Sequence, residues 1–368
     1  MNILILPNSF KGSLSARQTA RVLSTALSKK HCIKSFPLSD GGDGFIDFWK
    51  ALFPSAQTVR LRTSNAFHNK SNTSYLWLKD SKTAVIETAR ICGLGQAKKE
   101  ELDPLNATSY GVGEAILHAI NKGAEKIYIG LGGVACNDGG AGIAQALGAK
   151  FFDSVGREIS LGAQSLLNLK NIDIAFLKKQ IKNTKIYAVA DVTNPMLGPK
   201  GSARIFGPQK GATPQQVEIL EKSLSVYARA VKKLTGKEIG HTPSTAAAGA
   251  LCAGLYGLLN AKIILGADFL QQHLPLDPWT EWADLLITSE GKLDRQTLFG
   301  KAPSCVLNTA GKHKKPALFI CGIYEEKVLQ TLPKNLQLTV VSLSDFAKNQ
   351  EDCMRRCRHY LRQVVKNI

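Results

Sequence analysis

The sequence lacks several patterns that would assign it at once to a class of protein. No apolar run approaches the roughly 20 residues that cross a bilayer, so we expect no membrane partner. The first apolar run, MNILIL, stops at Pro7 and has no basic leader, which favours a first strand over a signal peptide and predicts a cytoplasmic protein. The eight cysteines form no CxxC pair and no paired metal spacing, so we expect free thiols.

Two common nucleotide-binding motifs are also missing. No Gly-Lys pair is followed by Ser or Thr, which excludes a Walker A loop. The main glycine-rich loop does not have the G-x-G-x-x-G spacing of the dinucleotide fingerprint, which argues against a nucleotide-dependent oxidoreductase. The net charge of +18 could signal nucleic acid, but the lysines are spread along the chain without an RNP or helix-turn-helix motif. We therefore expect no nucleic-acid partner and interpret the charge as a field that attracts small polyanions.

What the sequence does have is the composition and the strand pattern of an α/β protein. Its 368 residues are 44% hydrophobic and 21% charged, enough for about two domains. Strands at 2–6 and 33–37, with three more after residue 284, would make a parallel sheet of the flavodoxin-like order 2-1-3-4-5. We expect a discontinuous flavodoxin-like domain of residues 1–59 plus 285–368 and a large inserted mixed α/β domain of residues 60–284. A single sheet shared by the whole chain is the alternative.

The pattern also predicts the main elements of the inserted domain. Antiparallel strands are expected at 59–63, 73–79 and 83–87, and buried strands at 126–130 and 185–189. Helices are expected at 110–121, 142–147, 176–181, 214–235 and 245–259, and a final helix of the chain from residue 345.

The glycine-rich stretch from 125 to 148 has the most constrained backbone. It connects a predicted strand to a predicted helix through Gly132, Gly133, Asn137 and Asp138, residues that suit positive φ or a close approach of backbone. Such a loop presents N–H groups to an anion, most often a phosphate. A tight turn without a ligand fits the same residues.

Polar loops follow the first two strands. Lys11 lies ahead of a helix that Ser15 and Gln18 cap, although a solvated surface lysine fits equally well. The second strand opens into Asp40-Gly41-Gly42-Asp43, whose carboxylates could bind a metal or the hydroxyls of a small substrate. A turn with a helix cap is the alternative for that segment.

Two further polar segments follow later strands. Asp191 comes just past the strand at 185–189, with Asn194 at turn spacing and Lys210 in a glycine-rich, anion-friendly stretch. The strand that begins at 285 runs into a segment that carries Glu290, Asp294 and Lys301.

Five blocks together resemble the type-1 family of bacterial glycerate kinases along nearly the whole chain. They are NSFKGSLSA from Asn8, PLSDGGDG from Pro37, GLGGVACNDGG from Gly130, ADVTNPMLGPKGSARIFGPQKGAT from Ala190, and ITSEGKLDRQTLFGKAP from Ile287. The resemblance implies two α/β domains and transfer of the γ-phosphoryl group of ATP, with Mg²⁺, to a hydroxyl of D-glycerate. It favours 2-phosphoglycerate as the product.

The sequence departs from the family pattern at a few positions. The family usually has Asp at Asn8, Ser and Thr at Val134 and Cys136, and Gly at Ser289. Its GAGAAGG stretch stands here as Thr245 to Ala250. With two hydroxyls gone from the central loop, phosphate there would depend on backbone N–H groups.

The expected roles follow from what phosphoryl transfer requires. We assign the base to Asp191, with Asp294 as the second candidate, and the neutralising charges to Lys11 and Lys210, with Lys301 a weaker candidate. The phosphate cradle would be Gly132, Gly133, Asn137 and Asp138, and Asp40, Asp43 or Glu290 would place Mg²⁺. Gly41, Gly42 and Asn194 complete the predicted binding residues, and we expect all these loops to share one cleft. A non-catalytic paralogue that binds a small acid is the alternative.

Overall fold

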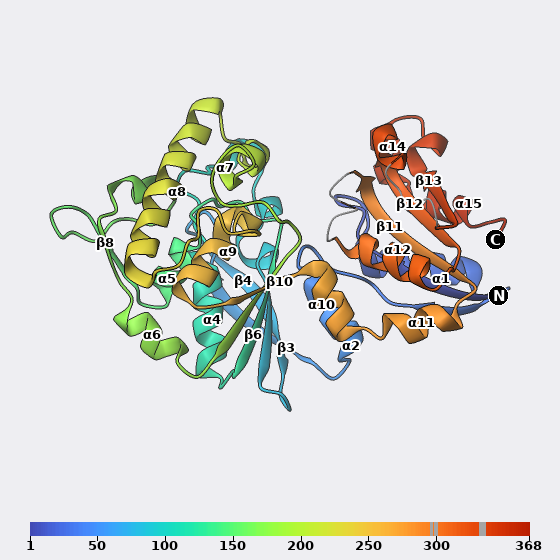
Figure 1. The fold of residues 1–368 in the computed structure, drawn as a ribbon, viewed down its shortest axis with the longest axis horizontal. Helices are drawn as coiled ribbons and strands as arrows, with labels where there is room; N and C mark the ends of the chain where they lie inside the picture. The colour runs from blue at the N-terminus through green and yellow to red at the C-terminus, as the bar shows by residue number, and fades with distance from the viewer. Residues whose placement is uncertain (295–296, 298–300, 331–335) are drawn as a thin grey trace. The chain divides into compact units, whose positions relative to one another are not determined.

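The chain forms two compact units. A computed structural model describes residues 1–294, 297, 301–330 and 336–368 (Figure 1). The first unit consists of Met1–Leu52 and Gly266–Ile368, and the second of Phe53–Leu265. The second unit is thus inserted in the sequence of the first.

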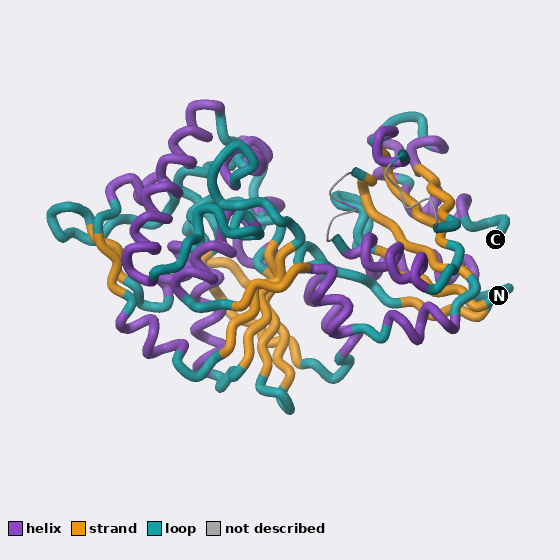
Figure 2. The backbone as a smooth tube through the Cα atoms, viewed as in Figure 1, coloured by secondary structure: helices purple, strands orange, loops and turns teal. Residues whose placement is uncertain are grey.

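The first unit is built on a parallel sheet. Its strands are β1 (Asn2–Pro7), β2 (Cys32–Ser35), β11 (Leu285–Leu293), β12 (Ala317–Tyr324) and β13 (Leu338–Ser342). Their order is β13-β12-β11-β1-β2, and all neighbours run parallel. Counted within this unit, the order is 2-1-3-4-5, which confirms the flavodoxin-like prediction. The strands in Figure 2 form a separate sheet in each unit, so the alternative of one shared sheet is wrong.

The first unit has helices on both faces of this sheet and others that pack on those helices. They are α1 (Ala16–Leu27), α2 (Phe45–Leu52), α10 (Gly266–His273), α11 (Leu276–Trp282), α12 (Ala302–Lys312), α13 (Glu326–Leu329), α14 (Gln350–Arg355) and α15 (Cys357–Val364). The connections from β1 to β2 and from β11 to β12 step in opposite directions across the sheet, so right-handed crossovers place α1 and α12 on opposite faces (Figure 1). α1 begins at the predicted capping box of Ser15 and Gln18, and it packs with α15 over the apolar side chains of β1.

The second unit contains a mixed sheet. Its strands are β3 (Gln57–Ser64), β4 (Lys70–Leu78), β5 (Thr83–Glu87), β6 (Lys126–Leu131), β9 (Lys185–Ala190) and β10 (Lys262–Leu265), with a small separate pair, β7 (Lys150–Phe152) and β8 (Asn171–Asp173). The order is β10-β9-β6-β5-β4-β3. As predicted, β3, β4 and β5 are antiparallel, and from β5 to β10 the neighbours are parallel.

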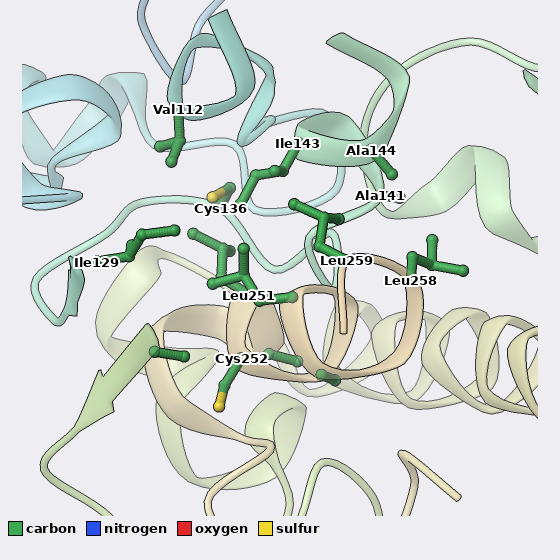
Figure 3. Close-up of a cluster of buried hydrophobic side chains, with 14 of the residues drawn as sticks. Val112, Ile129, Cys136, Ala141, Ile143, Ala144, Leu251, Cys252, Leu258 and Leu259 are labelled. Carbon is green, nitrogen blue, oxygen red and sulfur yellow. The ribbon is translucent and has the colours of Figure 1, made fainter. Parts of the chain in front are cut away.

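The second unit has helices that pack on this sheet and others that pack on those helices. They are α3 (Ala89–Cys92), α4 (Tyr110–Asn121), α5 (Ala141–Ala146), α6 (Ala175–Ile181), α7 (Ser202–Phe206), α8 (Pro214–Thr235) and α9 (Ala247–Leu258), with a 3-10 turn, η4 (Pro208–Lys210). In the core, Val112 of α4, Ile143 of α5 and Leu251 of α9 gather near Ile129 of β6 (Figure 3). Cys136 of the glycine-rich loop lies in the same cluster.

Some elements differ from the prediction. The predicted final helix from residue 345 is wrong, because the chain makes a 3-10 turn at Leu343–Phe346 and α14 begins only after Asn349, whose side chain accepts from the N–H of Asp352. The strand β10 and the helices α10 and α11 were not predicted, since they are short. Against the expected ranges of 1–59 plus 285–368 and 60–284, α10 and α11 belong to the first unit because they pack on α12.

Two further expectations concern cysteines and membranes. All eight cysteines lie within the described residues and are free thiols, as predicted. Among the described residues, no helix has the length and apolar character that a membrane span requires.

Candidate functional site

The carboxyl ends of β5, β6 and β9 bring the glycine-rich loop beside Asp191. Glu87 of β5 pairs with Gly130 of β6, and Leu131 of β6 pairs with Ala190 of β9. Gly132 and Asp191 are therefore the next residues on two neighbouring parallel strands. In α/β proteins, ligands usually bind at this edge of the sheet, where polar groups follow the strands.

Thr88 orders the start of the glycine-rich loop. Its hydroxyl donates to the carbonyl of Gly130 at 2.9 Å and accepts from the N–H of Gly132 at 3.4 Å. The residue is fully buried. Thr88 is not among the residues predicted from the sequence, although a hydroxyl directly after the end of a parallel strand was the available signal.

The glycine-rich loop is only partly accessible. Gly132 and Gly133 are half-buried, whereas residues 134–144 are buried. Gly133 has a φ of 62°, and its carbonyl accepts from the N–H of Leu94 at 2.7 Å. Of the predicted cradle, Gly132 and Gly133 are thus the residues that a ligand can reach directly in this structure.

Asp138 anchors the starts of two helices. Its carboxylate accepts from the N–H and the hydroxyl of Ser109, at 2.7 and 2.9 Å, and from the N–H groups of Gly140 and Gly142, at 3.1 and 3.3 Å. Thr108 adds a hydroxyl donor at 3.3 Å. Burial raises the pKa of Asp138, and the donated hydrogen bonds oppose that rise. The carboxylate is saturated inside the protein and fixes the loop to α4 and α5.

Lys210 is buried beneath the same loop. Its Nζ donates to the carbonyl of Cys136 at 2.6 Å and to Oδ1 of Asn137 at 2.8 Å. The lysine is 2% exposed and Asn137 is 0% exposed. Burial lowers the pKa of Lys210 from 10.5 to about 8. Asn137 and Lys210 are therefore hydrogen-bonded to each other, but inside the protein and not on a surface that a ligand can reach.

A strained segment closes this cluster from the side of α9. Ser244, Ala248 and Ala250 have φ values of 68°, 53° and 63°, in the left-handed region that alanine and serine rarely adopt. Gly249 lies between the two alanines, and its carbonyl accepts from the N–H of Gly139 at 3.3 Å. A Cβ on Gly249 would lie 1.9 Å from the carbonyl oxygen of Cys136, so only glycine fits there.

The loop after β9 carries Asp191 and Asn194, and both are half-buried. The side-chain amide of Asn194 donates to the carbonyl of Lys200 at 2.8 Å. The carbonyl of Asn194 accepts from the N–H of Ala246 at 3.1 Å. The loop is thus attached to the strained segment that also holds the glycine-rich loop.

In the first unit, Lys301 and Glu290 form an ion pair. Their Nζ and Oε1 atoms are 3.0 Å apart, and the side chains are 15% and 12% exposed. The other carboxylate oxygen, Oε2 of Glu290, is buried and has no hydrogen-bond partner among the described residues. Burial raises the pKa of Glu290, and the charge of Lys301 opposes that rise.

Asp40 caps helix α12. Its Oδ2 accepts from the N–H of Ala302 at 3.2 Å and lies 3.5 Å from the side-chain amide of Asn8. An aspartate at position 8, as the family resemblance predicts, would put two carboxylates there, whereas Asn8 supplies a donor. Ser289 is buried, and its hydroxyl donates to the carbonyl of Asn8 at 3.2 Å.

The other predicted residues of the first unit are less enclosed. Lys11 and Asp43 are exposed, Gly42 is half-buried, and Gly41 is buried with a φ of 107°. Asp294 is half-buried, and its Oδ1 accepts from the N–H of Thr297 at 3.2 Å. Residues 295–296 and 298–300 of the last motif lie outside the described residues. The expectation that loops of both units share one cleft stays a prediction.

The fold and the placement of these groups define a class. This is an α/β protein whose glycines, lysines and carboxylates gather at the carboxyl ends of parallel strands, where such folds bind small ligands.

The chain belongs to the glycerate kinase family, because the family model matches residues 3–368. The glycerate 2-kinase of Escherichia coli K12 is 40% identical over 89% of this chain and 87% of its own length. The glycerate kinase of Halalkalibacterium halodurans is 33% identical over 100% of this chain and 97% of its own. A crystal structure from Salmonella typhimurium LT2, provisionally identified as glycerate kinase 2, has a TM-score of 0.79 and 34% identity, and the match covers 100% of this chain and 96% of that one. These matches confirm the glycerate kinase family that the five motifs predicted, and the type-1 subtype stays a prediction.

Two departures from the family pattern lie in the core. Val134 and Cys136 are 2% and 0% exposed. A hydroxyl at either position would be enclosed by the protein, and a small apolar or thiol side chain suits that environment. A hydroxyl at either position would therefore not be accessible to a ligand in this structure.

Proposed function

We propose that this chain transfers the γ-phosphoryl group of ATP to a hydroxyl of D-glycerate and that the product is 2-phosphoglycerate. The observation that carries the proposal is the match of the glycerate kinase family to residues 3–368, supported by the glycerate 2-kinase that is 40% identical. The chain is an ATP-dependent kinase, and the alternative of a non-catalytic paralogue is not favoured. The type-1 subtype is part of the proposal, as is the division into a discontinuous flavodoxin-like domain and an inserted domain.

In the second unit, the proposed direct contacts come from accessible groups. Gly132 and Gly133 would approach a phosphate through backbone N–H groups, and Asn194 would contact the substrate. Asp191 is the proposed base, because a half-buried carboxylate beside this loop can accept the proton of the attacking hydroxyl. Asn137, Asp138 and Lys210 would support the loop, and their complete burial favours that role over direct contact.

In the first unit, Lys11, Lys301 and the loop of Asp40, Gly41 and Gly42 are the proposed binding residues. Lys11 is exposed, so its long side chain can reach an anion. Asp294 remains the second candidate for the base. Asp40 is engaged as the cap of α12, which supports a role in fixing the N-terminus of that helix near Lys301.

Mg²⁺ is the proposed metal, and Glu290 is its best candidate ligand in this unit. The described residues bring together no group of three His, Cys, Asp or Glu side chains that could hold a metal ion. Mg²⁺ in kinases commonly takes one or two carboxylates and completes its shell with phosphates and water. Oε2 of Glu290, which has no hydrogen-bond partner among the described residues, fits this ion. Asp43 is a weaker candidate because it is exposed. When bound, the metal neutralises charge on the phosphate oxygens.

A coupled assay of ADP release tests the proposal directly. ADP should appear with ATP, Mg²⁺ and D-glycerate, and not when D-glycerate is omitted. Phosphorus NMR of the product then distinguishes 2-phosphoglycerate from 3-phosphoglycerate. Binding of D-glycerate without any release of ADP would instead support the paralogue, and 3-phosphoglycerate would refute the regiochemistry alone.

A further inference from the structure

Lys210 is almost completely enclosed by the protein. It was predicted to neutralise a substrate phosphate, but it is 2% exposed and its Nζ already donates to Cys136 and Asn137. Burying an ammonium group costs free energy unless hydrogen bonds or an opposite charge compensate for the lost water. Its position therefore calls for a different role.

We propose that Lys210 is a positioning residue that holds and polarises the glycine-rich loop from beneath. Lys210 would thereby increase the rate of phosphoryl transfer without touching the substrate. The inference rests on the proposed kinase function and deepens it. In this proposal the lysine fixes the geometry of the loop and makes no direct contact with the substrate.

The hydrogen bonds give the first argument, because they tie two loops together. Lys210 ends η4, in the segment that follows Asp191 and Asn194, whereas Cys136 and Asn137 belong to the loop after β6. The bonds of 2.6 and 2.8 Å reach both the backbone and the side chain at the same point of that loop. One side chain thus links the loops that carry Gly132 and Asp191.

The packing around Nζ gives the second argument. A Cβ on Gly249 would lie 2.6 Å from Nζ of Lys210 and 2.9 Å from Oδ1 of Asn137. The backbone of the strained segment therefore closes the space around the ammonium group. Because left-handed alanines persist only where the surroundings impose them, the strain at Ala248 and Ala250 is consistent with a fixed cage around Lys210.

The charge gives the third argument. An ammonium group that bonds to the carbonyl of Cys136 places a positive charge beneath the loop that carries Gly132 and Gly133, where it favours the approach of a phosphate to their N–H groups. The titratable groups that interact with Lys210 are the thiols of Cys136 and Cys92 and the carboxylate of Asp138. A neutral amine keeps two N–H groups, enough for both acceptors. Loss of the proton would therefore remove the charge while leaving the geometry in place.

Lys210→Met tests the proposal against Lys222→Met, the same change at an exposed lysine of α8. We expect Lys210→Met to lower kcat at pH 7 by at least about tenfold, with a smaller change in KM for ATP and D-glycerate, since no substrate contact is lost. The wild-type kcat should fall as the pH rises through about 8, and the profile of Lys210→Met should lack that fall. A purely structural lysine would give the two proteins the same profile.

Amide hydrogen exchange of the segment 131–140 provides a readout that does not need turnover. Exchange there should be at least about tenfold faster in Lys210→Met and unchanged in Lys222→Met. A kcat within threefold of wild type, identical pH profiles, or unchanged exchange in Lys210→Met would each overturn the proposal. If the wild-type protein releases no ADP with D-glycerate, the proposed function fails, and hydrogen exchange still decides whether Lys210 holds the loop.

Discussion

Replacing Ala248 with glycine should stabilise the protein, although the same change in a helix usually destabilises. Ala248 lies within the span of α9 but has φ 53° and ψ 50°. A left-handed conformation costs a non-glycine residue roughly 1–2 kcal/mol, and glycine adopts it freely. Ala248 packs against the core but is only half-buried, so the loss of its methyl group removes only part of a methyl group's burial.

The expected magnitude follows from two opposing terms. Ala248→Gly removes the strain of roughly 1–2 kcal/mol, and the greater freedom of glycine in the unfolded chain takes back about 0.5–1 kcal/mol. Taking the middle of each range, the net gain is about 0.75 kcal/mol. In a unit of this size the thermal midpoint should rise by about 2 °C.

Ala230→Gly is the matched control. Ala230 is a half-buried alanine in the right-handed interior of α8, so glycine there should destabilise by about 1 kcal/mol. Urea unfolding followed by circular dichroism measures both variants against wild type. If Ala248→Gly lowers the midpoint as Ala230→Gly does, the strain at this position is not real and the reasoning is refuted.

Three other predictions follow from the site. Burial lowers the pKa of Lys210 from 10.5 to about 8. Between these two pH values the lysine is neutral in the folded protein and still charged in the unfolded chain, so the free energy of unfolding should rise with pH. Wild type should therefore gain about 3 kcal/mol relative to Lys210→Met over that range, and parallel urea midpoints would contradict this. Asp138→Asn should destabilise by about 3 kcal/mol, because the saturated carboxylate is lost, whereas the exposed Glu158→Gln should stay within about 0.5 kcal/mol; equal unfolding midpoints would disprove the anchoring role. Asp191→Asn should lower kcat about 10²–10⁴-fold at an unchanged thermal midpoint, and near wild-type turnover would move the base to Asp294.

Elements with a strong apolar pattern were predictable from the sequence. The bounds of β5, α4 and α8 are as predicted, because each has a strong apolar pattern. α8 also has Thr213 and Gln216 as a capping box and Pro214 at its first position. The strand β10 was missed because four residues, KIIL, carry no periodicity that separates a strand from the end of the preceding helix.

The site was predictable in its location and not in its accessibility. Gly132 and Asp191 were expected at the carboxyl ends of strands, and the pairing of β6 with β9 puts them side by side. The burial of Lys210 depends on Gly249, which is distant in sequence, and the capping role of Asp40 depends on Ala302, 262 residues further on. A pattern of local residues carries no signal for contacts of that range.

The split sequence of the first unit has a consequence for synthesis on the ribosome. β1 is a central strand with Ile3, Leu4, Ile5 and Leu6 all 0% exposed, yet its neighbour β11 begins only at Leu285. In the nascent chain, the edge of β1 that pairs with β11 therefore stays unpaired until Leu285 and the residues after it have been translated. Because unsatisfied strand edges promote aggregation, we expect this N-terminal segment to be the part of the newborn protein that most needs a chaperone.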